Sequence, residues 1–243
     1  MFRRLLNVFE RIRAQRGDPE GVAAAVHTMD AMGELIGRGD LVMLRRMRAS
    51  ETGRRLLEAR HDILEVVTDR VALRALPDGS LGREYVRFAD TKQLFPEVLA
   101  SQTREARCDS GGLVPNATPE VAYLHDRYRD LHDLWHVATG YDTDMAGEWG
   151  LLAFQTQQTG YRSMMLMASI GCFLTAIRGR LDLIGVWLGG RRRGKRAANL
   201  LAQDWERLLP MPLDAVREEL GLNPPPVYRP YNYPESAKAA ARG

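Results

Sequence analysis

The fold is decided between residues 118 and 140, where the chain reads TPEVAYLHDRYRDLHDLWHVATG. Thr118 is a good helix N-cap, and a proline at the first helical position followed by a glutamate suits the first turn. Gly140 is typical of the residue just beyond a helix C-terminus. These signals predict one helix from Thr118 to Thr139, with an apolar side that faces a core and carries Leu131, Leu134 and Trp135.

Two histidines on this helix are the first candidates for chemistry. His132 and His136 are four residues apart and therefore stand on one helix face, which Asp133 borders. A second helix that begins near Ala146 would fold back and present Glu148. Nitrogen and oxygen ligands without thiolates favour Zn, Mn, Fe or Co over Cu(I) or a structural zinc finger. We therefore expect a divalent metal site, zinc first, while the spacing alone leaves a solvated polar helix face as the alternative.

The run His-Asp-x-x-His-x11-Glu from His132 to Glu148 resembles the motif of the Coq-four family of ubiquinone (coenzyme Q) biosynthesis proteins. Similar stretches follow at 155–160 and, more faintly, at 204–208 and 216–221, and one precedes it at 85–88. The resemblance implies an all-helical protein that acts on, or holds, a polyprenylated benzoquinone precursor. It also implies that the family's four metal-motif positions fall on His132, Asp133, His136 and Glu148.

The resemblance further implies an activity, which is the replacement of the ring carboxyl at C1 by a hydroxyl. This would be a metal-dependent oxidative decarboxylation of a polyprenylated hydroxybenzoate-type intermediate, a lyase or oxygenase-type step. The family is also associated with scaffolding other quinone-biosynthesis enzymes, so a non-catalytic lipid-binding scaffold is the alternative. Two stretches depart from the family pattern: the turn reads Asp142-Thr143-Asp144 where the family has an Asn, and the tail after Gly221 is unlike the usual family ending.

The remaining sequence predicts further helices and no sheet. Helical patterns cover about 19–36, 41–48, 50–59, 63–76, 197–209 and 212–220, and only 86–89 favours a short extended piece. We therefore expect an all-α protein with a single helical domain, a two-helix metal motif and an apolar lipid-accommodating core. Its parts would be a basic amphipathic N-terminal arm (1–17), the helical domain (18–222) and a tail rich in proline and tyrosine (223–243) that lies extended along a surface.

An apolar stretch follows the motif and is a candidate for contact with lipid. It is uncharged from Ser163 to Ile177, which is shorter than the roughly 20 residues of a membrane-spanning helix. The simpler interpretation of this stretch is a buried core helix. The more specific hypothesis is that it lines a tunnel for an isoprenoid tail. Residues that we expect to line the substrate pocket are Trp135, Gln155, Thr159 and Met164.

Charge is clustered rather than extreme. The formal net charge of +3 is too small to imply nucleic acid. Gly189-Gly190 predicts a chain break, after which Arg191, Arg192 and Arg193 would meet phosphate headgroups or other anions. The N-terminal arm is either an ordinary surface helix or an interfacial helix on anionic lipid. We therefore expect peripheral association with a membrane.

Compartment and partners follow from weaker signals. Cys108 and Cys172 make no disulfide framework, which favours a reducing compartment. We expect a bacterial cytoplasmic protein at the inner membrane, with the matrix face of the mitochondrial inner membrane as the alternative because the N-terminus is rich in arginine. Expected partners are the quinone precursor, other quinone-biosynthesis enzymes and a second copy in a homodimer. A His-Asp phosphohydrolase is disfavoured because the chain has only five histidines.

Overall fold

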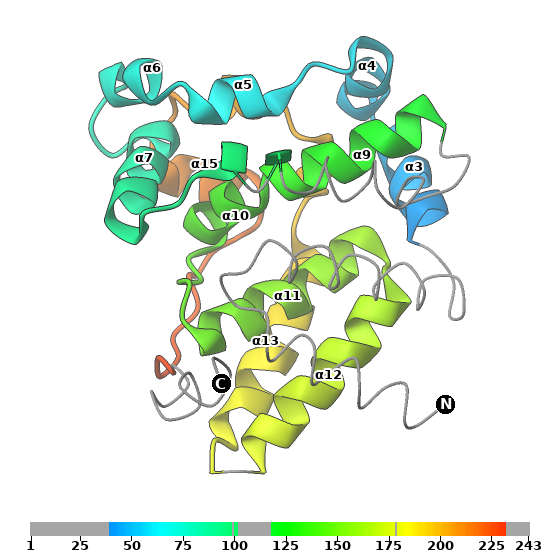
Figure 1. The fold of residues 1–243 in the computed structure, drawn as a ribbon, viewed down its shortest axis with the longest axis vertical. Helices are drawn as coiled ribbons and strands as arrows, with labels where there is room; N and C mark the ends of the chain where they lie inside the picture. Colours follow the sequence, from blue (N-terminus) through cyan, green and yellow to red (C-terminus); the bar gives the residue numbers. More distant parts are fainter. Residues whose placement is uncertain (1–38, 99, 102–117, 178, 232–243) are drawn as a thin grey trace.

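The computed structural model describes residues 39–98, 100–101, 118–177 and 179–231 (Figure 1). The regular secondary structure of these residues is entirely helical. The helices are α3 (Asp40–Arg48), α4 (Glu51–Ala59), α5 (Ile63–Thr68), α6 (Arg70–Ala75), α7 (Leu81–Lys92), α9 (Pro119–Asp130), α10 (His132–Thr139), α11 (Met145–Thr159), α12 (Arg162–Ala176), α13 (Asp182–Arg196), η1 (Leu200–Ala202), α14 (Trp205–Leu208) and α15 (Leu213–Glu219). The prediction of an all-α single domain is confirmed. The predicted N-terminal arm, the 19–36 helix and Cys108 lie outside the described residues.

The helices form two groups that meet at α10 and α11. In Figure 1, α11, α12 and α13 lie together in the lower half, and α4 to α7 and α9 lie in the upper half. The larger core includes the fully buried side chains of Trp135, Trp205, Tyr85 and Phe154. A second, smaller core joins α11, α12 and α13 and contains Cys172. Because α11 contributes to both cores, it has a fixed position between the two groups.

The closest helix contact in the lower group depends on glycines. A Cβ on Gly190 would lie 2.3 Å from the Gly150 carbonyl oxygen, and one on Gly194 would lie 2.5 Å from that of Phe154. The predicted break at Gly189-Gly190 is therefore wrong, because α13 runs through both residues. Glycine inside a helix costs roughly 0.5–1 kcal/mol relative to alanine. The close approach of α13 to the α11 backbone is the compensating gain.

The predicted helix around the two histidines begins and ends where the structure has helix ends, but the structure divides it in the middle. The Thr118 hydroxyl caps α9 by accepting from the Val121 amide, and Gly140 ends α10 with a φ of 80°. The single predicted helix is two, α9 and α10, with the buried Leu131 between them. Leu131 is joined to both helices by backbone bonds, since its amide donates to the Arg127 carbonyl and its carbonyl accepts from the Trp135 amide.

Three other predicted boundaries are wrong for local reasons. The 63–76 helix divides at Asp69, whose carboxylate accepts from the Ala72 amide and begins α6. The 197–209 helix is replaced by η1 and α14, because Asn199 and Asp204 side chains bond nearby amides. Such local bonds compete with helix continuation. The extended piece at 86–89 is instead part of α7. Within the described ranges, none of the helices has the length and apolar character needed to cross a bilayer.

Candidate metal centre

The motif residues meet between α10 and the first turn of α11. One ligand atom from each of His132, Asp133 and His136 lies within 4.8 Å of the others. The two imidazole rings have centroids 4.9 Å apart and are inclined at 71°. Glu148, in the first turn of α11, places Oε1 3.6 Å from His136 Nε2. The helix spacing therefore brings all four predicted ligand residues to one place, and metal occupancy stays a prediction.

His136 shows that the residues fit a cation. Its Nδ1 lies 3.0 Å from the Tyr141 carbonyl oxygen, which can only accept, so Nδ1 carries the proton and Nε2 has a lone pair. His136 Nε2 is buried and has no hydrogen-bond donor in the described part of the chain. It faces a carboxylate oxygen, another acceptor. Two acceptors face each other favourably only with a proton or a metal ion between them, and a carbonyl that orients the second imidazole nitrogen is typical of metal-bound histidine.

The two histidines have opposite electrostatic environments. Burial, and next the neighbouring His132, lower the pKa of His136 to about 4. Burial also lowers the pKa of His132, but the hydrogen bond to Asp133 and the charge of Glu148 outweigh burial, so its pKa is raised overall. His136 is therefore neutral and ready to bind a metal, whereas at His132 a proton competes with the metal.

The remaining carboxylates near the motif are bound by other partners. Arg129 holds Asp126 and Asp130, each at 2.7 Å, and Lys92 holds Asp142 at 2.6 Å. Asp126, Asp130 and Asp142 are thus compensated by cations. Asp133 contacts His132 at 3.2 Å, and Glu148 contacts His136 at 3.6 Å.

The turn before Glu148 is fixed by the C-terminal tail. Asp144 Oδ1 accepts from the Ala146 amide at 3.0 Å, which caps α11, and from the Tyr231 amide at 2.8 Å. The Tyr228 hydroxyl donates to Asp144 Oδ2 at 3.2 Å and accepts from the Asp142 amide at 2.8 Å. The sequence predicts only an extended tail along a surface, whereas residues 223–231 hold the motif turn. The sequence features that could have indicated this contact are Tyr228 and Tyr231 in the tail and the two aspartates, Asp142 and Asp144, in the turn.

Phe88 forms a further wall that the sequence did not assign. Its ring stacks on His136 with centroids 5.9 Å apart and 25° between the planes. Phe88 comes from α7, in the stretch that resembles the family but that was interpreted as extended. One helical face of α7 therefore covers the buried histidine.

The predicted substrate-pocket residues lie in the interior beside the motif. Trp135 is buried with its indole N–H unpartnered in the described region, and so is the side-chain nitrogen of Gln155. Tyr128 donates to Gln155 Oε1 at 3.0 Å, and the Thr159 hydroxyl donates to the Gln155 carbonyl at 2.9 Å. The Met164 side chain lies outside the described residues. The role of these residues in substrate binding, like the lipid-accommodating core, stays a prediction.

The predicted headgroup residues have three different environments. Arg193 donates to the carbonyls of Thr139 at 2.8 Å and Leu222 at 2.6 Å, so it fastens the end of α10 to the tail. Arg192 is exposed, and Arg191 is half-buried and lines a cavity. Lipid contact by these residues stays a prediction.

The fold and this cluster define a helical protein with a nitrogen–oxygen metal centre between two consecutive helices as its candidate site. A family model described as "Coenzyme Q (ubiquinone) biosynthesis protein Coq4" matches residues 22–226. The chain belongs to this Coq4 family, which places it in coenzyme Q biosynthesis.

Individual relatives agree with this assignment. The mitochondrial ubiquinone biosynthesis protein COQ4 homologue of Danio rerio is 37% identical over 205 residues, which cover 83% of this chain and 71% of the relative. The Homo sapiens homologue is 34% identical over 209 residues, with coverages of 83% and 73%. A crystal structure of a protein from Nostoc punctiforme has a TM-score of 0.61 and 22% identity, covering 89% of this chain and 96% of that one. This last comparison shows a shared fold.

Proposed function

We propose that this protein catalyses a metal-dependent oxidative decarboxylation of a polyprenylated hydroxybenzoate-type precursor of ubiquinone. The carboxyl carbon leaves as CO2, and the ring carbon gains a hydroxyl whose oxygen comes from water. The two electrons and two protons released pass to dioxygen, which is reduced to hydrogen peroxide. The observation that carries the proposal is the buried His136 Nε2, which has no donor in the described chain and faces Glu148 Oε1 at 3.6 Å. We assign a divalent ion, zinc first and Fe, Mn or Co otherwise, to His132, Asp133, His136 and Glu148.

The protein's own residues prepare this site. The Tyr141 carbonyl keeps the proton of His136 on Nδ1, and Asp133 orients His132 through a contact of 3.2 Å to Nδ1. When bound, a divalent ion supplies positive charge that stabilises negative charge developing as CO2 departs. Phe88 covers one side of His136 and excludes water there.

A second candidate function is a non-catalytic lipid-binding scaffold for other quinone-biosynthesis enzymes. The hairpin of α12 and α13 exposes large apolar side chains along its helices and at its tip: Leu166, Phe173, Ile177, Leu181, Ile184 and Leu188. Arg192 follows Leu188 by one turn on the same face of α13 and is also exposed. An apolar helix face that is continued by a cation suits the interface of an anionic membrane. This surface supports the proposal of peripheral association with a membrane. It also offers a docking place for partner enzymes or for a second copy of the chain.

The compartment follows from the same proposal. We propose association with the cytoplasmic face of a bacterial inner membrane, and the matrix face of the mitochondrial inner membrane as the alternative. The names of the Danio rerio and Homo sapiens relatives specify mitochondria, which supports the alternative for this family.

Metal content tests the site directly. Elemental analysis of the purified protein should give about one divalent ion per chain in the wild type and much less in His132→Ala. His61→Ala is the matched control, because His61 is exposed and should leave the metal content unchanged. A folded wild type that takes up no zinc, iron, manganese or cobalt would refute the metal centre.

Glu148→Ala separates the two functions. If the protein is a catalyst, this variant should stay folded and lipid-bound while it no longer converts the carboxylated precursor to the phenol, as followed by mass spectrometry. If the metal only clamps α10 to α11, Glu148→Ala should lower the unfolding midpoint and partner binding together. Unchanged turnover in Glu148→Ala would contradict the catalytic proposal.

A further inference from the structure

A second polar site lies at the other end of α11. A cavity of about 170 Å³ opens where α11 ends and α12 begins, and arginines from three helices line it: Arg46 of α3, Arg162 of α12 and Arg191 of α13. Twelve residues of helical rise separate Gly160 at this cavity from Glu148, which is about 18 Å. The cavity is therefore distinct from the metal centre.

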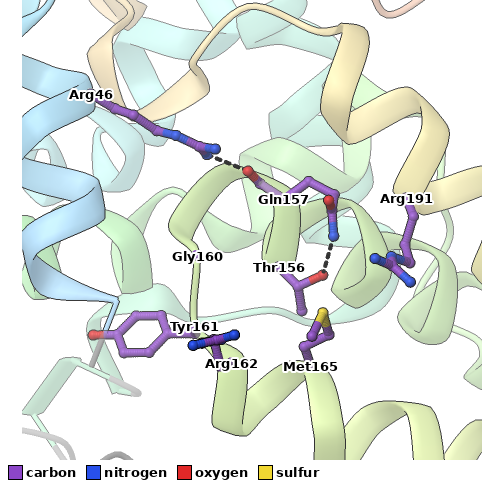
Figure 2. Close-up of a pocket in the computed structure, with 8 residues that line it drawn as sticks. All are labelled: Arg46, Thr156, Gln157, Gly160, Tyr161, Arg162, Met165 and Arg191. Atoms are coloured by element: carbon purple, nitrogen blue, oxygen red, sulfur yellow. Dashed lines mark hydrogen bonds between the residues drawn. The ribbon is translucent and has the colours of Figure 1, made fainter. Parts of the chain in front are cut away.

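The charges around the cavity are of one sign. The residues that line it include three guanidinium groups and no carboxylate. Figure 2 shows Arg162 and Arg191 on either side of Thr156 and Met165. Neither arginine has a salt bridge within the described part of the chain, and Arg191 Nε is buried there without a hydrogen-bond partner. A buried, unpaired donor beside a second cation is an incomplete arrangement that an anion would complete.

Arg46 has a different role at the same cavity. Its guanidinium donates to the carbonyl oxygen of Gln157 (Figure 2). It also donates, at 2.5 Å, to the carbonyl oxygen of Gln158. These carbonyls belong to the last turn of α11, where a helix carries partial negative charge. Burial, and next Arg45, lower the pKa of Arg46. Arg46 thus cancels the negative end of α11 and leaves the cavity positive.

The backbone adds to this positive potential. The 15-residue helix α12 begins at the cavity, and its N-cap residue Tyr161 makes no side-chain capping bond. The amides of an uncapped first turn are free to bind an anion and carry the positive end of the helix dipole. Arginine fork donors suit an anion with several oxygens, such as phosphate.

We propose that this cavity binds the phosphate group of a phosphate ester or diphosphate, with Arg162 and Arg191 as its principal ligands. Met165 provides an apolar wall for the organic part of such a molecule. The phosphate belongs either to a soluble ester or to a lipid headgroup, and both present the same chemistry to the site. Of the three arginines 191–193, only Arg191 takes part in this cavity, because Arg193 is bound to carbonyls elsewhere.

The test is calorimetric titration with inorganic pyrophosphate at constant ionic strength. The wild type should bind saturably, and Arg162→Gln and Arg191→Gln should each weaken binding about tenfold or more, since each removes charge-assisted hydrogen bonds. Arg196→Gln is the matched control, because it removes the same charge from the exposed end of α13 outside the cavity. Absence of saturable binding, or equal weakening in Arg191→Gln and Arg196→Gln, overturns the proposal.

A second arm identifies the source of the phosphate. Vesicles of phosphatidylcholine with phosphatidylglycerol are sedimented with each protein. Pyrophosphate that displaces the wild type from vesicles, together with reduced sedimentation of Arg162→Gln and Arg191→Gln, supports a lipid headgroup. Unchanged sedimentation with lost pyrophosphate binding supports a soluble ester. His132→Ala should bind pyrophosphate like the wild type, so a failed metal centre and a failed phosphate site give different results.

Discussion

Adjacent glycines in α13 should respond to alanine in opposite directions. A Cβ on Gly190 would lie 2.3 Å from the Gly150 carbonyl oxygen and 3.0 Å from Ala153 Cβ, whereas one on Gly189 meets nothing within 4 Å. The 2.3 Å between a Cβ on Gly190 and the Gly150 carbonyl oxygen is about 1 Å shorter than an ordinary van der Waals contact. Because that oxygen belongs to the backbone, α11 and α13 would have to move apart. Overpacking of this kind costs about 1–3 kcal/mol, and the better helix propensity of alanine returns about 0.5–1 kcal/mol.

Gly190→Ala should therefore lower the free energy of unfolding by about 1–2 kcal/mol, while Gly189→Ala should raise it by about 0.5–1 kcal/mol. Urea titrations followed by circular dichroism measure both variants. With a slope of about 2–3 kcal/mol per molar urea, the two midpoints should differ by about 1 M. If Gly190→Ala is as stable as Gly189→Ala, the close packing of α11 against α13 is refuted.

Two further predictions concern the metal centre and its support. Asp144→Ala should destabilise the protein by about 2–4 kcal/mol in urea, since it removes the α11 cap and the bonds to the tail. Asp214→Ala, whose side chain is 92% exposed, should stay within about 0.5 kcal/mol, and equal effects of the two changes would contradict the role of the tail. Zinc affinity should fall as the pH falls through the raised pKa of His132, because the proton and the metal compete for one imidazole. Competition with a chromogenic chelator from pH 8 to pH 6 measures this slope, and a flat profile would contradict the competition.

Local sequence signals were sufficient where the structure depends on local contacts. The cap at Thr118, the stop at Gly140 and the four-residue spacing of His132 and His136 all act within one or two helical turns. The sequence therefore predicts the all-α class and the meeting of the four motif residues. Predicting that Glu148 lies at the site required the family resemblance as well as the spacing.

Contacts between distant residues account for what the sequence left out. Phe88 reaches His136 across 48 positions of the chain, and Tyr228 reaches Asp144 across 84. No periodicity in either segment specifies such a partner. The same holds for Lys92, which pairs with Asp142 across 50 positions of the chain.

The arginine run shows how one wrong boundary changes a functional interpretation. A chain break at Gly189-Gly190 would let Arg191, Arg192 and Arg193 form one basic patch on a loop. Because α13 continues through the glycines, successive residues are turned by about 100° around the axis, and Arg191 and Arg193 differ by about 200°. They must therefore serve different neighbours, and they do: Arg193 binds the carbonyls of Thr139 and Leu222, and Arg191 lines the cavity. Replacing Arg193 should consequently lower stability, whereas replacing Arg191 should lower anion affinity, so the two effects should separate between residues only two positions apart.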